Sequence, residues 1–235
     1  MIVANGTPAT LAAKSATTTI PIVFGTGGDP VALGLVASLN RPGANVTGIA
    51  SLSLELAPKQ LQLVRELMPN ATVFGLLADP AIPYNPSIIA DLQAAARTLG
   101  LQLVVANART DSDLEKAFAI FSQQHVGAVL VSDSNFYKRR TEQLAALAAR
   151  HALPAIFPLR EYTLAAGLMS YGSGLGYRHH QAGIYTGRVL KGEKPADLPV
   201  EQAVRIGLTL NLKTAKALGI EFPTGLLVRA DEVIE

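Results

Sequence analysis

The chain has 235 residues, of which 49% are hydrophobic, enough for one large domain or two small ones with packed cores. Its 20 lysine and arginine residues against 18 acidic residues leave a formal net charge of +2, too small to indicate nucleic acid binding. The chain has no cysteine, which excludes disulfides and thiolate metal sites. It also has no apolar run that approaches the roughly 20 residues of a membrane span, so no membrane insertion is expected.

The first residues read as the end of a strand, over residues 1–4, followed by a loop at residues 5–8 and a short helix over residues 9–16. A chain that begins inside a strand suggests a truncated gene product or a reading frame that starts at an internal methionine. Such a start would leave one edge of the sheet exposed. No basic segment followed by an apolar one is present, so we expect no signal peptide in this sequence.

Residues 20–48 predict a strand, a glycine-rich loop, a helix and a second strand. The β-branched apolar run over residues 20–24 predicts a buried strand, and the glycines of residues 25–28 predict a turn. Asp29 and Pro30 suit the N-cap and the first position of a helix. We expect the buried face of this helix to comprise Val31, Leu35, Val36 and Leu39.

The loop of residues 25–29 lies at the carboxyl end of its strand, where open parallel sheets bind ligands. It lacks the third glycine of a dinucleotide fingerprint, and no Gly-Lys-Ser/Thr of a P-loop follows it. The pattern therefore favours a ligand-binding loop and disfavours a nucleotide.

From residue 52 onward, helices and strands alternate. Helices are expected over residues 52–68, 85–99, 111–124, 136–151, 177–190 and 212–218, and strands over residues 72–78, 101–106, 128–132, 155–157, 168–171 and 203–210. The strands are continuous apolar runs, which is typical of a parallel sheet covered by helices on both faces. The predicted fold class is therefore α/β, with parallel sheets in Rossmann-like units.

No residues form a recognisable catalytic arrangement. The sequence has no GxSxG and no HExxH, and it has no cluster of histidines and carboxylates at the spacing of metal ligands. His179 and His180 are adjacent, so on a helix they point about 100° apart and do not share a metal. We expect no enzyme, no metal and no cofactor.

Polar residues gather instead at four strand ends, in residues 5–7, 26–29, 79–85 and 132–135. The first two loops precede predicted helices, whose N–H groups and positive dipole ends suit a carboxylate. Asp133 is the candidate partner for a ligand ammonium, or alternatively caps the helix that begins near residue 136. The candidate ligand-binding residues, in which the tyrosines would supply a stacking wall, are Asn5, Thr7, Thr26, Gly27, Asp29, Tyr84, Asn85, Asp133, Asn135, Tyr162 and Tyr171.

The stretch IPIVFGTGGDPVALGLVASLNRPGANVTG resembles the substrate-binding proteins of ABC importers, in the branch that includes tryptophan-binding members. The resemblance continues through ELAPKQLQLVRELMPN, LPAIFPLREYTLAAGLMSYG, GIYTGRVLKGEKPADLPV, NLKTAKALGI and RADEVIE, and so covers essentially the whole chain. It implies a periplasmic-binding-protein type I fold with two lobes. The first lobe, incomplete at its N-terminus, would comprise residues 1–49 and 171–199, and the second residues 50–170 and 200–235.

The resemblance also implies a function: an importer's solute-binding component, periplasmic in the full-length family, that captures a small molecule between its lobes and docks to permease subunits. The small molecule would be an amino acid or another small carboxylate or amide. Tryptophan-binding members carry an Asp in the region that matches residues 171–174, where this chain has Ser173 among glycines. Two alternatives stay open, an intracellular ligand-sensing module of the kind fused to transcription regulators and a truncated fragment without function.

Overall fold

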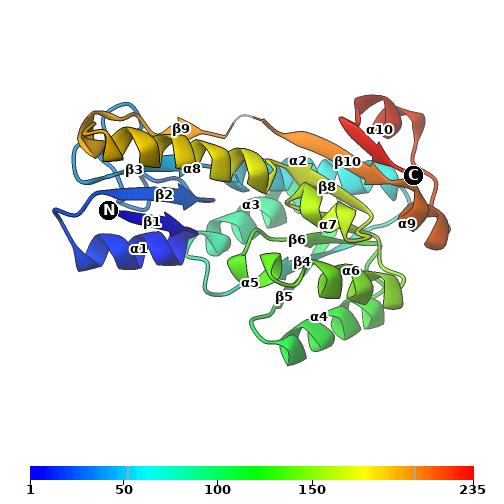
Figure 1. The fold of residues 1–235 in the computed structure, drawn as a ribbon. Helices are drawn as coiled ribbons and strands as arrows, with labels where there is room; N and C mark the ends of the chain where they lie inside the picture. Colours follow the sequence, from blue (N-terminus) through cyan, green and yellow to red (C-terminus); the bar gives the residue numbers. More distant parts are fainter. Residues whose placement is uncertain (52, 204) are drawn as a thin grey trace. The chain divides into compact units, whose positions relative to one another are not determined.

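The computed structural model describes residues 1–51, 53–203 and 205–235, and the chain forms two compact units (Figure 1). Unit 1 comprises residues 1–54 and 173–205, and unit 2 comprises residues 55–172 and 206–235. The family resemblance predicts crossings after residues 49, 170 and 199, and each crossing comes a few residues later in the structure. The third comes later because β9 (Glu201–Gln202) still pairs with β3 (Val46–Ala50), a strand of unit 1.

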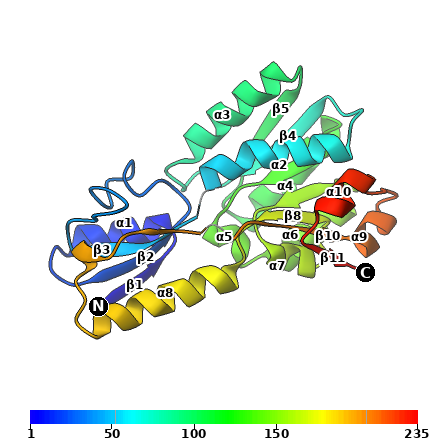
Figure 2. The same ribbon diagram turned by 90° about the horizontal axis from the view of Figure 1, so that it is seen from above.

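Unit 1 contains a four-stranded parallel sheet in the order β1-β2-β3-β9, where β1 spans Ile2–Asn5 and β2 spans Ile22–Thr26. Ile22 and Phe24 pack into a cluster to which α1 (Thr7–Ala16) contributes, and Val23 between them packs into a second cluster with α8 (Leu175–Leu190). This alternation is why both faces of the sheet are covered (Figure 2).

The helix predicted after Asp29 is wrong. Asp29 Oδ1 accepts the backbone N–H groups of Val31 and Ala32, as an N-cap does, but the chain then forms turns. Gly34 adopts φ +65°, a left-handed conformation that ends the first turn. Leu35 and Val36 are buried in the core of unit 1, as predicted for the apolar face, whereas Val31 is exposed.

Unit 2 contains a seven-stranded sheet in the order β11-β10-β8-β7-β6-β4-β5. Its strands are β4 (Val73–Ala78), β5 (Gln102–Asn107), β6 (Ala128–Val131), β7 (Ala155–Phe157), β8 (Met169–Gly172), β10 (Gly207–Asn211) and β11 (Glu232–Ile234). Its helices are α2 (Ser53–Leu67), α3 (Asn85–Thr98), α4 (Asp111–Gln123), α5 (Asn135–Lys138), α6 (Thr141–Arg150), α7 (Arg160–Leu164), α9 (Leu212–Ala217) and α10 (Thr224–Arg229). In Figure 1, α4 and α6 lie on one side of strands β4 to β6, and α2 and α3 on the other.

The mixed α/β fold with mostly parallel sheets is confirmed, with one local exception. β10 pairs with β8 antiparallel, with Gly207 opposite Gly172. The chain leaves unit 2 after β8 and returns beside the end of the same strand, so β10 must run back along it. Every other strand pair in the described part of unit 2 is parallel.

The helix predicted over residues 136–151 is interrupted. α5 ends at Lys138 and α6 begins at Thr141, because Arg140 between them has a non-helical backbone. Its side chain reaches Asp111 Oδ1 at 2.6 Å and lies over the ring of Phe136. Three short elements, α7, α10 and β11, are not among the predicted ones, and each has six residues or fewer.

Two expected elements reach positions that the structure does not describe. Leu52, the predicted start of a helix, and Val204, inside a predicted strand, lie outside the described residues. Within α2, Leu61, Val64 and Leu67 are buried.

Candidate functional site

In unit 1, two buried threonines meet at the carboxyl ends of β1 and β2. Thr26 is the last residue of β2, and Thr7 is the first residue of α1. Their hydroxyl oxygens lie 2.6 Å apart, and the Gly28 N–H donates to Thr26 Oγ1 at 3.2 Å. The parallel register of the two strands brings these predicted site residues together, and Gly27 is buried in the same loop.

A residue that the sequence analysis did not select, Arg178, lies at the same edge of unit 1. Its Nη1 donates to Ser51 Oγ at 3.1 Å, and both the N–H and the hydroxyl of Ser51 donate to the Thr26 carbonyl oxygen, at 2.8 and 3.0 Å. Ser51 follows β3, and Arg178 belongs to the first part of α8. The edge therefore combines hydroxyl groups with a guanidinium.

The two other predicted residues of this edge, Asn5 and Asp29, differ in their roles. Asn5, which ends β1, has its Nδ2 2.9 Å from His179 Nε2, one residue beyond Arg178 on α8. Asp29 is exposed, and its Oδ1 accepts two N–H groups of its own turn. Asp29 therefore stabilises the loop conformation.

In unit 2, the equivalent edge is built around a buried carboxylate, that of Asp79, which follows β4. Asp79 Oδ1 accepts from Arg109 Nη1 at 2.8 Å and from the Ala81 N–H at 3.0 Å, and Oδ2 accepts the Ser134 hydroxyl. Asn85 Nδ2 donates to the Asp79 carbonyl oxygen at 2.6 Å. Asp79 thus connects the loops after β4, β5 and β6.

Asp133, the predicted ammonium partner, follows β6 and forms an ion pair with Lys138 at 2.7 Å, with side-chain exposures of 7% and 14%. It does not cap α5, because the neighbouring Ser134 does so by accepting the Phe136 N–H at 3.0 Å. Asn135 lies at the start of α5, and its Oδ1 is 3.4 Å from Lys138 Nζ. The structure therefore places a cation beside the carboxylate that the sequence analysis selected.

The predicted tyrosines differ in burial. Tyr162 is fully buried, and its ring stacks on Phe157 with centroids 4.9 Å apart. Burial, followed by the negative charge of Asp133, raises the pKa of Tyr162 well above its ordinary value, so its hydroxyl keeps its proton. Tyr84 is buried at the N-cap of α3, and Tyr171 is half-buried in β8.

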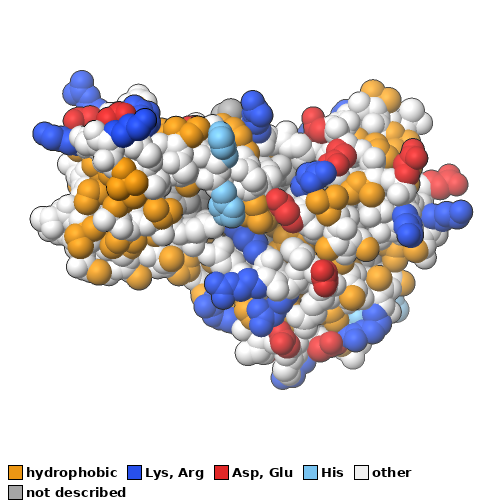
Figure 3. Space-filling model, in the orientation of Figure 1, with side chains coloured by type: hydrophobic (Ala, Val, Ile, Leu, Met, Phe, Trp, Pro, Cys, Tyr) orange, Lys and Arg blue, Asp and Glu red, His pale blue; other side chains and the backbone are white. Residues whose placement is uncertain are grey.

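The surface near this edge of unit 2 is basic. Figure 3 shows lysine and arginine side chains gathered over α5, a region where the sequence contains Lys138, Arg139 and Arg140. Within this cluster, Lys138 is largely buried beside Asp133.

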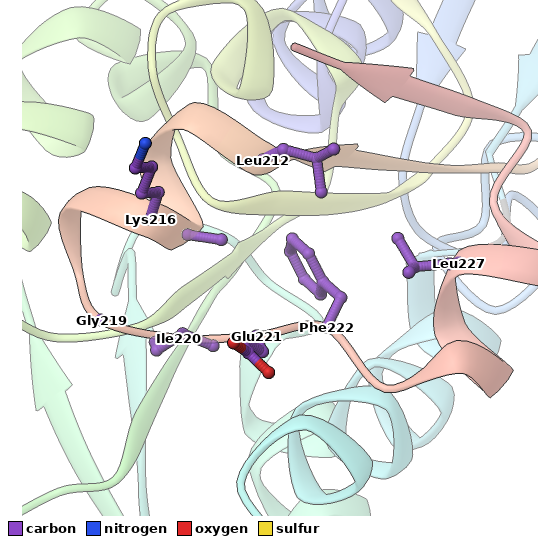
Figure 4. Close-up of a pocket in the computed structure, with 8 residues that line it drawn as sticks. Leu212, Lys216, Gly219, Ile220, Glu221, Phe222 and Leu227 are labelled. Atoms are coloured by element: carbon purple, nitrogen blue, oxygen red, sulfur yellow. The ribbon is translucent and has the colours of Figure 1, made fainter.

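Unit 2 also has an open hollow of about 490 Å³ between α9 and α10 (Figure 4). Its apolar lining includes Leu212, Ile220, Phe222 and Leu227. α9 follows β10, which is antiparallel to β8, so this hollow lies at the amino-end edge of β8. In the described part of unit 2, the predicted ligand-binding residues belong to the opposite edge.

Among residues 1–51, 53–203 and 205–235, no group of three or more histidines and carboxylates is placed to hold a metal ion. A search of the same residues finds no helix with the length and apolarity needed to cross a membrane.

Comparisons with known proteins place the chain in a family. The family described as ABC transporter substrate binding protein matches residues 1–234. A tyrosine-binding protein of Clostridioides difficile (strain R20291) is 28% identical over 224 residues, which are 94% of this chain and 63% of that protein. The chain thus spans less than two thirds of the length of this curated relative.

Two solved structures have closely similar folds. A conserved domain protein of Vibrio cholerae O1 biovar El Tor has a TM-score of 0.89 and 29% identity, over 99% of this chain and 78% of that one. A Streptococcus pneumoniae ABC domain in complex with L-Trp has a TM-score of 0.88 and 26% identity, over 100% of this chain and 80% of that one. Both support the predicted periplasmic-binding-protein type I fold.

Proposed function

The chain belongs to the ABC transporter substrate-binding protein family, and from this premise we propose that it is the solute-binding component of an ABC importer. Its ligand would be an amino acid or another small carboxylate or amide. Two relatives support this class of ligand, since one is named as a tyrosine-binding protein and another was solved with L-Trp. The family match over residues 1–234 is the observation on which the proposal depends.

The polar strand-end residues of each unit support a binding role. Ligand binding at the carboxyl ends of strands is the rule for open α/β sheets, and both units present buried polar side chains there. The proposed ligand-binding residues are Asn5, Thr7, Thr26 and Gly27 in unit 1, and Asn85, Asp133, Asn135 and Tyr171 in unit 2. Arg178 extends this set. We further propose permease subunits as partners, an extracytoplasmic location, and no catalytic step.

A thermal-shift screen of the purified chain against amino acids, small carboxylates and small amides tests the proposal. A ligand at about 100 times its Kd adds about 2.7 kcal/mol to the free energy of unfolding. At roughly 2–4 °C per kcal/mol for a chain of this size, the melting temperature would rise by about 5–10 °C. A cooperative melt that no compound shifts would contradict the proposal.

A second experiment addresses the partner. The ligand-bound chain should stimulate ATP hydrolysis by its cognate permease complex reconstituted in vesicles. A Thr7→Val, Thr26→Val variant, which keeps the side-chain shape but loses both hydroxyls, should stimulate less at a ligand concentration near the Kd, provided that its circular dichroism spectrum matches that of the wild type. Equal stimulation by both proteins would argue against these hydroxyls as ligand contacts.

A further inference from the structure

The hollow between α9 and α10 of unit 2 is open and mostly apolar. Figure 4 shows the side chains of Leu212, Phe222 and Leu227 gathered at one part of it. Phe222 is buried, whereas Leu212 is half-buried and Leu227 is 37% exposed. Apolar surface that stays in contact with water is unfavourable, so an apolar group that enters the hollow would stabilise it.

An apolar side chain, that of Val228, projects beside this hollow. It is 80% exposed, the largest value among the exposed large apolar side chains in the described part of the chain. Val228 follows Leu227, which lines the hollow, and neighbouring residues of a helix do not face the same side. Val228 therefore points away from the hollow of its own molecule. One surface thus carries both a projecting apolar side chain and an apolar hollow.

Contacts within unit 2 hold α10 in place. Leu226 is fully buried, and the guanidinium of Arg229 pairs with Glu66 of α2 and also donates to the Gly225 carbonyl oxygen at 2.8 Å. These contacts fix the residues on either side of Val228 and Leu227. Because the surface is ordered before it meets a partner, little further conformational entropy is lost on association.

The charges that line the hollow are of opposite sign. Lys216 of α9 and Glu221 of the following segment both line it, and both are exposed. In a two-fold symmetric dimer, a residue of one copy meets a second residue of the other copy, and the reverse contact forms as well. The same rotation can therefore bring each Lys216 to the Glu221 of the other copy. A surface with both charges is complementary to itself.

We propose that this surface of unit 2 binds a second copy of the chain, so that the protein forms a two-fold symmetric dimer. Val228 of each copy enters the hollow of the other, and Lys216 pairs with Glu221 across the interface. The inference is independent of the proposed solute-binding function, since the predicted ligand-binding residues of unit 2 lie at the opposite edge of its sheet. An interface built on one hollow and one short helix is small, so the dimer should be weak and concentration-dependent.

Sedimentation analysis of the full 235-residue chain tests the inference. Between about 10 μM and about 1 mM, the chain should change reversibly from monomer to dimer. Val228→Asp should raise the dissociation constant of the dimer about tenfold or more, because it places a carboxylate in an apolar hollow. Leu190→Asp is the matched control, since Leu190 is 71% exposed at the end of α8 in unit 1, and it should leave the dissociation constant unchanged.

Charge reversal tests the pairing across the two-fold axis. Lys216→Glu and Glu221→Lys should each raise the dissociation constant about tenfold, because each puts like charges together twice in the dimer. An equimolar mixture of these two variants should associate as a heterodimer, since all the facing charges are then opposite. The double variant should regain self-association for the same reason. Both positions are exposed, and circular dichroism checks that each variant is folded.

Three results would overturn the inference. A chain that stays monomeric up to about 1 mM would exclude the dimer and leave the hollow to another kind of partner. A dimer that Val228→Asp and Leu190→Asp weaken equally would place the interface elsewhere. Failure of the equimolar mixture to associate more tightly than either variant alone would contradict the reciprocal pairing of Lys216 with Glu221.

Discussion

Both units place polar groups at the carboxyl ends of parallel strands, but different interactions hold these groups in the two units. Unit 1 uses neutral hydroxyl contacts between Thr7, Thr26 and Ser51, with one guanidinium among them. Unit 2 uses ion pairs, in which Asp79 and Asp133 each face a cation. In unit 2 each of these aspartates lies beside a cation, whereas in unit 1 the guanidinium of Arg178 lies beside a hydroxyl group, that of Ser51.

Because of this difference, we expect the polar groups of unit 2 to contribute mainly to stability and those of unit 1 mainly to ligand binding. A buried carboxylate that connects three loops is costly to remove, because its hydrogen-bond donors lose their acceptor. Replacing a pair of hydroxyl groups should cost less free energy of unfolding, and it leaves the local charge unaltered. We therefore expect substitutions in unit 2's edge to affect mainly folding, and substitutions in unit 1's edge to affect mainly ligand affinity.

The largest expected effect is the loss of stability when a methyl group is added to a tightly packed glycine in either unit. A Cβ at Gly48 of β3 would lie 2.1 Å from the Phe24 carbonyl oxygen, and a Cβ at Gly172 of β8 would lie 2.0 Å from that of Pro158. Since backbone atoms must shift, each Gly→Ala change should cost about 3 kcal/mol or more. Hydrogen exchange should show lost protection chiefly in the unit that carries the change.

Gly187→Ala is the control for this comparison. Gly187 lies within α8, and a Cβ there meets no atom within 4 Å. This change should raise the free energy of unfolding by about 0.5–1 kcal/mol, because alanine loses less entropy in a helix. Wild-type melting by either of the other two variants would contradict the packing argument.

The second prediction concerns the carboxylate that connects the loops of unit 2. Asp79→Ala leaves the Ser134 hydroxyl, the Ala81 N–H and Arg109 without this acceptor, and should lower the free energy of unfolding by about 2–3 kcal/mol. The matched control is Asp111→Ala, because the exposed carboxylate of Asp111 pairs with Arg140. This change should lower the free energy of unfolding by less than about 0.5 kcal/mol. Urea denaturation measures both. Similar losses in the two variants would remove the distinction between buried and exposed pairs.

Much of the fold was predictable because buried parallel strands are continuous apolar runs, as in β4 and β6. The helix after Asp29 was mispredicted because its capping signal is genuine, yet Gly34 takes a left-handed conformation after one turn. The helix-start signal of Asp29 and Pro30 therefore predicts the first turn correctly, but it does not predict whether a helix continues beyond that turn. The antiparallel pairing of β8 with β10 depends on where the chain re-enters unit 2, which no local pattern records.

The candidate site was predictable only in part for a related reason. The residues selected at strand ends are those that follow an apolar run, such as Thr26 and Asp133. Arg178 lies inside a helix, and it reaches the edge of unit 1 only because α8 packs beside β2 and β3. Lys138 follows Asp133 by only five residues, but two further basic residues come directly after it, and such a run is typical of a solvated face rather than of a buried ion pair.

The smallest expected effect comes from ion pairs at the surface, where the two units should behave alike. The hydrogen bond from Arg160 lowers the pKa of Glu232 in unit 2, and the hydrogen bond from Arg188 lowers the pKa of Glu193 in unit 1. A lowered pKa in the folded state means that the ionised carboxylate stabilises the protein above its ordinary pKa of 4.5, and that this contribution is lost as the pH falls through the folded value.

Arg160→Met should therefore lower the free energy of unfolding near pH 7 by about 0.5 kcal/mol, the scale of an exposed pair. The difference from the wild type should shrink as the pH falls from 4.5 toward 3, because both proteins then hold a protonated Glu232. Arg188→Met should show the same sign and the same pH window in unit 1. Urea midpoints measured at a series of pH values test both variants. A difference from the wild type that stays constant from pH 7 to pH 3 would mean that the lost stability comes from packing of the arginine side chain and not from its charge. For Arg188, the packing partner would be the ring of Tyr185.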